Sequence, residues 1–232
     1  MLKWKDIWEN RTEVDGPLLY NMLVMNGYDA GIHKIDPDEV AAATKEYRDA
    51  LGIQPQDSIY EVGCGCGAVL YIHSLFGNRV AGSDYSQSQI ERAKKYCPQG
   101  QFECSEANAI PIEPKFDFVL ANGVFLYFPD YGYAETVIEK MLQKARKAVY
   151  VEAVPDAAKK KEAIWFKKKA IGEEEYYRRH VEGGLAHLYY EKAWFEEIGR
   201  KHGAEVSIRP LNITSWSDNN DFKYNCILRA CS

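Results

Sequence analysis

The residues from Ser58 to Ala68 combine an acid and three glycines at a spacing that suits ligand binding. They read S-I-Y-E-V-G-C-G-C-G-A, in which Glu61 is followed by Gly63, Gly65 and Gly67. A short apolar run that leads into a glycine loop and then a helix lets backbone N–H groups approach a ligand closely. Glycine suits such a loop because it has no Cβ and adopts positive φ at little cost. The stretch therefore predicts a site for a nucleotide-like cofactor.

Polar residues also follow three further apolar runs, which we predict to be strands. These polar stretches are Asp84 to Ser86, Ser105 to Ala109 and Asn122 to Tyr127. Ligands of an open α/β sheet bind outside the carboxyl ends of its strands, so all four stretches are expected to face one crevice. There Asp84 suits a ribose diol, while Glu106 and the N–H of Ala107 suit an adenine ring. The pattern predicts an adenosine held along the strand ends.

The glycine loop alone leaves the kind of cofactor open. Gly63, Gly65 and Ala68 also satisfy G-x-G-x-x-A, the fingerprint of dinucleotide-binding proteins. Two features argue against NAD: a carboxylate stands two residues before the first glycine, and there is no second domain for a hydride acceptor. Glu61 instead suits a ligand with a cationic amino-acid end.

With these motifs the sequence resembles the class I S-adenosylmethionine-dependent methyltransferases. E-V-G-C-G-C-G matches their first motif, G-S-D-Y-S their ribose-binding turn and S-E-A-N-A-I-P their adenine motif. The run F-D-F-V-L-A-N-G-V-F-L-Y-F-P-D matches the strand and loop beside the sulfonium. The match covers about residues 55 to 155 and places four motifs in order.

The resemblance implies S-adenosyl-L-methionine (SAM) as the cofactor and S-adenosyl-L-homocysteine (SAH) as its product. It implies that the glycine loop lines the methionine end, Asp84 binds the ribose, Glu106 and Ala107 meet the adenine, and Asn122 and Gly123 flank the reactive methyl. Glu106 departs from the commoner Asp but keeps an acceptor oxygen. The predicted cofactor-binding residues are Tyr28, Glu61, Gly63, Cys64, Gly65, Gly67, Asp84, Tyr85, Ser86, Glu106, Ala107, Asn108, Asn122 and Gly123.

Methyl transfer depends on positioning and desolvation, and a base is needed only if the acceptor arrives protonated. The candidate catalytic residues are Tyr127, Glu152 and His187. An unperturbed histidine is mostly neutral at pH 7, so His187 could deprotonate a hydroxyl or ammonium. A packed or surface histidine, a capped structural carboxylate and a pocket-wall tyrosine are the corresponding alternatives.

The elements that position these residues alternate between strand and helix from residue 58 onward. We predict strands at 79–84, 101–104, 116–121, 148–154, 205–209 and 222–230, with helices at 68–76, 87–96, from 130 and at 191–202. About three helices precede them, one running from the N-cap Asp36 to Gly52. The predicted fold is α/β: a doubly wound, Rossmann-like, seven-stranded and mostly parallel sheet with an antiparallel last strand.

A single domain is expected over residues 1–232. It comprises a helical N-terminal lid (1–52), a cofactor-binding core (53–155), a helical insertion after strand five that covers the acceptor site (156–190), and a C-terminal helix with a strand pair (191–232). The turn-rich patch carrying Tyr28, Asp29, His33 and Lys34 is either a connector or part of the lid.

The insertion combines lysines with aromatic residues, and both admit two interpretations. Lys159 to Lys161, Lys167 to Lys169, Arg178 and Arg179 form either a solvated helix face or a patch that steers an anionic substrate. Its tryptophan, phenylalanine and tyrosines, among them Trp165, either wall an acceptor pocket or pack the insertion on the sheet.

Composition narrows the function further. A net charge of −5 argues against nucleic acid as the main partner, and no run of about 18 apolar residues predicts a membrane span or a signal sequence. The six cysteines show neither disulfide nor zinc spacing, and Cys64 and Cys66 are favoured as packing residues over redox control. No metal is expected.

We therefore predict a cytoplasmic methyltransferase, monomeric or homodimeric. The expected acceptor is an oxygen or nitrogen of a small-molecule metabolite or natural-product intermediate. Methylation of a protein or peptide side chain, or a non-catalytic SAM-binding regulatory role, are the alternatives.

Overall fold

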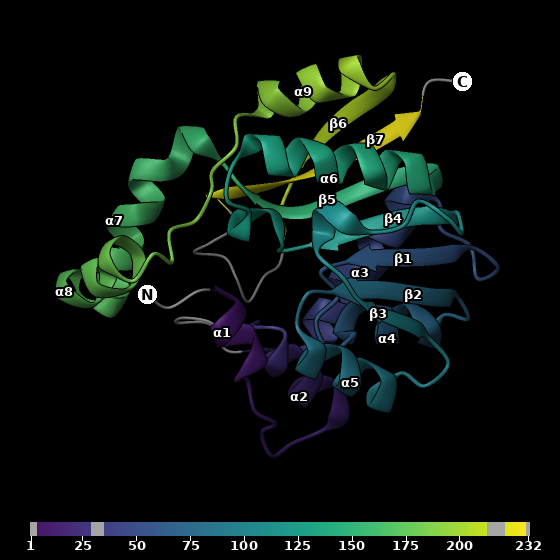
Figure 1. Cartoon of the computed structure of the whole chain (residues 1–232), viewed down its shortest axis with the longest axis horizontal. Coiled ribbons are helices and arrows are strands. Elements are labelled where there is room, and N and C mark those ends of the chain that lie inside the picture. The colour runs from purple at the N-terminus through teal and green to yellow at the C-terminus, as the bar shows by residue number, and fades with distance from the viewer. Residues whose placement is uncertain (1–3, 29–34, 213–220, 231–232) are drawn as a thin grey trace.

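The computed structural model describes residues 4–28, 35–212 and 221–230. A seven-stranded sheet forms its middle layer (Figure 1). The strands are β1 (Ser58–Val62), β2 (Arg79–Asp84), β3 (Gln101–Cys104), β4 (Phe116–Asn122), β5 (Ala145–Pro155), β6 (Ala204–Pro210) and β7 (Lys223–Ala230). They lie in the order β3-β2-β1-β4-β5-β7-β6, and β7 runs antiparallel to both neighbours. The predicted fold class is confirmed.

Helices cover both faces of this sheet. One face carries α3 (Pro37–Leu51), α4 (Ala68–Leu75) and α5 (Gln87–Tyr96); the other carries α6 (Tyr131–Lys144) and α9 (Lys192–Lys201). Successive residues of a strand alternate between the two layers: Ile59 packs with α3 to α5, whereas Tyr60 packs with α6 and α9. This period of two is the pattern of a sheet buried on both sides.

Side-chain caps mark where three of the helices begin. Asp36 accepts the Asp38 N–H at 2.9 Å, Ser86 accepts the Gln89 N–H at 3.3 Å, and Asp130 accepts the Tyr133 N–H at 2.8 Å. The helix starts predicted at 36–37, 86–87 and 130–131 are therefore confirmed.

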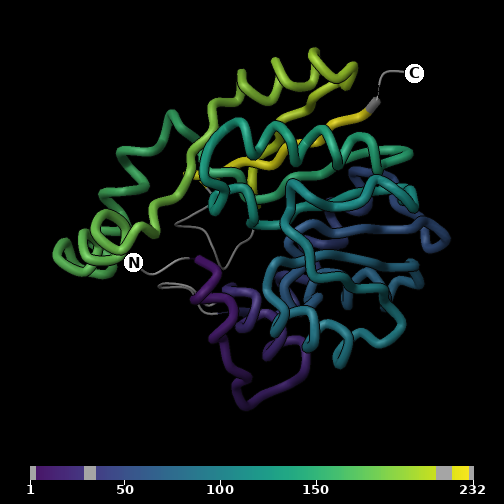
Figure 2. Tube along the Cα trace, in the orientation of Figure 1, coloured from purple at the N-terminus to yellow at the C-terminus, as the bar shows by residue number. Residues whose placement is uncertain are grey.

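Two short N-terminal helices, α1 (Trp4–Glu9) and α2 (Leu18–Met25), pack on the helices of one face: α1 contacts α5, and α2 contacts α3 and α4. Figure 2 shows α1 beside α5, although some 80 residues separate them. The Glu9 side chain accepts the Gln87 N–H at 2.9 Å at the start of α5. The positive end of the helix dipole favours a carboxylate at this position. The patch with Asp29, His33 and Lys34, predicted to be a connector or a lid segment, lies outside the described residues.

The insertion after β5 is helical only as far as residue 182. It contains a 3₁₀ turn (Ala157–Lys159), α7 (Lys160–Ile171), α8 (Glu173–Tyr176) and a π-helix (Tyr177–Glu182), and α7 and α8 project from the body as an arm (Figure 1). The prediction of helix throughout 156–190 is wrong for 183–190. Gly184 adopts a φ of 73°, which favours the end of a helix. The chain then returns to the sheet, where Leu188 N–H donates to Leu126 O at 2.9 Å.

Candidate functional site

A cavity of about 430 Å³ opens at the carboxyl ends of β1, β2 and β4, beneath the N-terminal helices. Its position agrees with the rule that ligands of such sheets bind at the strand ends. The predicted site residues that line it are Tyr28, Glu61, Gly63, Gly65, Asp84, Tyr85, Glu106, Ala107, Asn122, Gly123 and Tyr127. Most residues chosen from the sequence are thus brought together in one hollow.

The glycine loop is held to the C-terminal end of α2 by hydrogen bonds. Gly65 has a φ of 54°, and a Cβ there would stand 2.3 Å from Asn26 Oδ1. Asn26 Nδ2 donates to Cys64 O at 3.1 Å, and its Oδ1 accepts the Cys66 N–H at 2.8 Å. A glycine is therefore required at position 65, since a side chain would displace the Asn26 amide that holds the loop to the end of α2.

Glu61 supplies a buried carboxylate with one oxygen in need of a partner. The residue is 1% exposed, and its Oε1 accepts a hydrogen bond from Asn122 Nδ2 at 2.7 Å. Neither Glu61 Oε2 nor Asn122 Oδ1 has a partner among the described residues. Burial raises the pKa of Glu61 to about 8, because the Asn122 hydrogen bond only partly offsets desolvation and the nearby Glu152 and Asp84 carboxylates repel a further charge. A cationic ligand group at Oε2 would relieve this cost.

Asp84 is held in place by the backbone around it. Its Oδ2 accepts the Gly65 N–H and its Oδ1 the Ser86 N–H, both at 2.9 Å. Burial raises the pKa of Asp84 to about 6, so the carboxylate is mostly ionised at pH 7. Each oxygen keeps a lone pair for a ligand hydroxyl, which fits a ribose diol.

Glu106 and Ala107 line the cavity after the end of β3. Tyr133 OH donates to Glu106 Oε2 at 3.2 Å, and the 3₁₀ turn Ala107–Ala109 begins directly afterwards. The Tyr133 hydroxyl also lies within reach of the backbone N–H groups of Ala107 and Asn108. An acid and an N–H side by side match the edge of an adenine ring.

Four predicted cofactor residues do not line the cavity. Gly67 and Ser86 are the N-caps of α4 and α5, so they support the loops that carry the ligand-facing groups. The Cys64 side chain packs beside Gly82, and Asn108 sits inside the 3₁₀ turn after β3. Burial raises the pKa of the Cys64 thiol, which keeps it protonated and unreactive.

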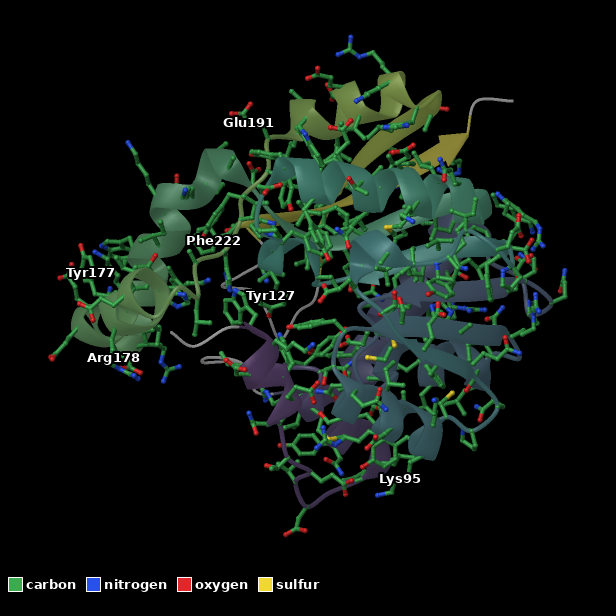
Figure 3. All side chains as sticks on the ribbon, viewed as in Figure 1. Lys95, Tyr127, Tyr177, Arg178, Glu191 and Phe222 are labelled. Carbon is green, nitrogen blue, oxygen red and sulfur yellow. The ribbon has the colours of Figure 1, made fainter. Side chains whose placement is uncertain are left out.

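The three catalytic candidates fall in different places. Tyr127 lines the cavity and faces α1 and the arm formed by α7 and α8 (Figure 3). The half-buried His187 ring lies behind it, with centroid distances of 5.7 Å to Tyr127 and 5.3 Å to Trp4. Glu152 is outside the cavity, in a separate hollow of about 90 Å³ where Tyr150 OH donates to Oε1 at 3.4 Å.

Electrostatics further separates these candidates. Burial lowers the pKa of His187 well below its usual value, reinforced by Lys167 and Lys223, so the imidazole is neutral at pH 7. Burial raises the pKa of Glu152 to about 7 and that of Tyr127 to about 12. At neutral pH His187 is therefore unprotonated, Glu152 is partly ionised and Tyr127 keeps its proton.

Sequence reasoning missed the contribution of α1 and of Asn26. Trp4, Lys5 and Trp8 line the cavity, and the Trp4 and Tyr127 ring centroids lie 4.6 Å apart. The apolar spacing of Trp4 and Trp8 indicated a helix with one buried face. It did not reveal that this face would meet a ligand cavity instead of a core.

The comparisons with known proteins agree with this site. Residues 59–149 match the family model described as a methyltransferase domain. Together with the strand order 3-2-1-4-5-7-6, this match identifies the central part of the chain as a class I, Rossmann-like methyltransferase domain. The resemblance inferred from the motifs is confirmed.

Particular relatives add detail. The ubiquinone biosynthesis O-methyltransferase of Bradyrhizobium sp. (strain ORS 278) is 29% identical over 114 residues, which are 44% of this chain and 45% of that protein. The chain thus spans about half the length of the curated relatives that it matches.

Two solved structures share the fold. The magnesium protoporphyrin IX methyltransferase from Synechocystis PCC 6803 with bound SAH has a TM-score of 0.60 at 17% identity, covering 91% of this chain and 96% of its own. An S-adenosylmethionine-dependent methyltransferase from Clostridium acetobutylicum ATCC 824 has a TM-score of 0.63 at 10% identity, covering 86% and 94%.

Two further properties concern the described residues alone. None of their helices combines the length and apolar character needed to cross a bilayer. Nor do their histidine, cysteine and acidic side chains gather anywhere in a group of three that would suit a metal ion.

Proposed function

We propose that this chain binds SAM in the 430 Å³ cavity and transfers its methyl group to an oxygen or nitrogen of a small-molecule metabolite or natural-product intermediate. The observation that carries the proposal is the unpartnered Oε2 of the buried Glu61, at the end of β1. Asp84 and Glu106 follow at the ends of β2 and β3. The three acids lie in the order in which SAM presents its ammonium, its ribose diol and its adenine amine.

The residues of the chain bind, orient and desolvate the reactants. When bound, SAM would supply a methyl group already activated by the sulfonium. Glu61 would hold the ammonium and Asp84 the ribose, which fixes the sulfonium between them. Trp4 and Tyr127 would exclude water from this region, and displacement at carbon gains from such positioning and desolvation.

Oxygen is the favoured acceptor atom, because the curated relatives are named as O-methyltransferases. A hydroxyl acceptor would lose its proton to a nearby base. His187 is our candidate for that base, since its ring contacts the cavity wall at Trp4 and Tyr127. Glu152 is a weaker candidate because a separate hollow holds it.

Calorimetry tests the cofactor assignment. We expect SAM to bind, and binding to weaken sharply in Asp84→Ala but not in Glu113→Ala, which removes an exposed acid from the loop that precedes β4. Binding of NAD in place of SAM would overturn the assignment.

Incubation with methyl-labelled SAM and a metabolite extract, followed by mass spectrometry, tests the transfer. A small molecule that gains one labelled methyl supports the proposal. A labelled protein side chain would establish the alternative acceptor. Tight SAM binding with no labelled product in any fraction would point to a non-catalytic regulator.

A further inference from the structure

Basic side chains gather beside the aromatic wall of the cavity, on the side of the insertion. Lys167 comes from α7, His180 from the π-helix, His187 from the returning segment and Lys223 from the start of β7. The His180 and His187 ring centroids lie 5.7 Å apart, and His187 contacts Trp4 and Tyr127 as described above. The cluster therefore adjoins the part of the cavity wall that Trp4 and Tyr127 form.

Lys167 and His187 are in direct contact within this cluster. Lys167 Nζ lies 2.6 Å from His187 Nδ1, which is within hydrogen-bond distance. Neither side chain forms an ion pair or hydrogen bond with a carboxylate in the described part of the chain. Two other lysines of the insertion do pair with acids: Lys159 with Glu162, and Lys168 with Glu173.

Burial and the neighbouring basic groups favour the neutral forms of Lys167 and His187. Burial lowers the pKa of Lys167 to about 7, with a further contribution from Lys223. His187 is affected by Lys167, Lys223 and His180, all of them basic. Burial lowers the pKa of Lys223 to about 8, and the Glu152 carboxylate partly offsets this effect. An incoming anion would pair with Lys167 and restore its charge.

Resting on the proposed function, we propose that Lys167, positioned by its contact with His187, anchors a carboxylate of the methyl acceptor. The His187 ring also contacts Trp4 and Tyr127, whose rings suit a flat, unsaturated acceptor skeleton. The acceptor class is therefore a cyclic or aromatic acid. Its carboxylate binds Lys167 Nζ, and the atom to be methylated points past Tyr127 into the cavity. In this arrangement His187 positions Lys167 and does not act as the base.

Calorimetry on the SAH complex at pH 8 tests this anchor with two matched probes, 4-hydroxybenzoate and its neutral amide, 4-hydroxybenzamide. We expect the acid to bind at least 10-fold more tightly than the amide, the range of a charge-assisted hydrogen bond. Lys167 is about 90% neutral at pH 8 for a pKa near 7, so binding of the acid should take up close to one proton. Titrations in two buffers of different ionisation enthalpy measure that uptake.

Lys167→Gln should abolish both the preference for the acid and the proton uptake, while SAH affinity stays unchanged. Lys169→Gln is the matched control: it removes a lysine from the same helix, but that side chain is exposed and stacks on Trp165. Lys167→Arg should retain the preference for the acid and lose the uptake, because arginine stays charged at pH 8.

Acid binding that does not exceed amide binding, or that survives in Lys167→Gln, would overturn the anchor, and so would two probes that fail equally to bind. Failure of the proposed function shows differently: the wild-type protein would then not bind SAH at all.

Discussion

Replacing Glu61 by Gln tests how the site recognises a cationic ligand. Glutamine keeps the shape of the side chain and its contact with Asn122, but it removes the charge. In the free protein the pKa of Glu61 is about 8, mainly because of burial. An ammonium at the unpartnered Oε2 would favour the ionised form, so binding of SAH should release the proton that Glu61 carries.

The size of this effect follows from the pKa. At pH 7 a group with a pKa near 8 is about 90% protonated, so binding should release about 0.9 proton. Deprotonation at that pH costs about 1.4 kcal/mol, which the ammonium must offset. A hydrogen bond to a charged group contributes about 1.5–3 kcal/mol, so Glu61→Gln should weaken SAH binding roughly 10- to 100-fold.

Calorimetry in phosphate and in Tris at pH 7 gives the number of protons released. The wild-type affinity should rise with pH between 6 and 7.5, by up to tenfold per unit, whereas Glu61→Gln should be nearly flat over this range. Asp84 contributes little release, since its pKa of about 6 leaves it mostly ionised at pH 7. Equal proton release in wild type and variant would refute the role of Glu61.

Three further outcomes are expected. Asp84→Asn should lower SAH affinity on the order of 10-fold, as measured by calorimetry, because one ribose acceptor becomes an amide donor. Gly65→Ala should lower the melting temperature and the SAH affinity together, because its Cβ would collide with Asn26 and alanine is strained at a φ of 54°. Gly132→Ala, in a helix with space, is the control: it should lower neither quantity, since alanine favours a helix more than glycine does. Trp4→Ala should raise the acceptor KM with little loss of stability, because the ring is half-buried; a large fall in melting temperature would instead assign it to the core.

The central fold was predictable because local and long-range signals agreed. The strands at 79–84 and 101–104 and the helix at 87–96 have the predicted bounds. Capping residues such as Ser86 indicated where helices begin, and apolar runs indicated the strands between them. The edge pair β6 and β7 was also predictable as antiparallel, since strands that follow one another along the chain commonly pair in that way.

The contacts that the N-terminal helices make with the site were predicted less completely. The contact between Asn26 and the glycine loop joins residues about 40 positions apart, and no local pattern encodes such a contact. The same holds for Trp4 against Tyr127. Residues 183–190 were predicted to be helical because the preceding charged run is helical, but Gly183 and Gly184 end the helix. The roles of His187, Tyr127 and Glu152 stay predictions.

Binding of the cofactor and binding of the acceptor should depend on pH in opposite directions, which gives a final prediction. Glu61 must lose a proton to hold the cofactor, so kcat/KM for SAM should rise as pH goes from 6 towards 8. Lys167 must be charged to hold an acidic acceptor, so kcat/KM for the acceptor should fall as pH rises through about 7. Rate profiles measured with each substrate varied in turn separate these slopes. Lys167→Gln should flatten the second profile alone and Glu61→Gln the first; a single variant that flattened both would mean that the two groups titrate as one coupled unit, contrary to the separation seen in the structure.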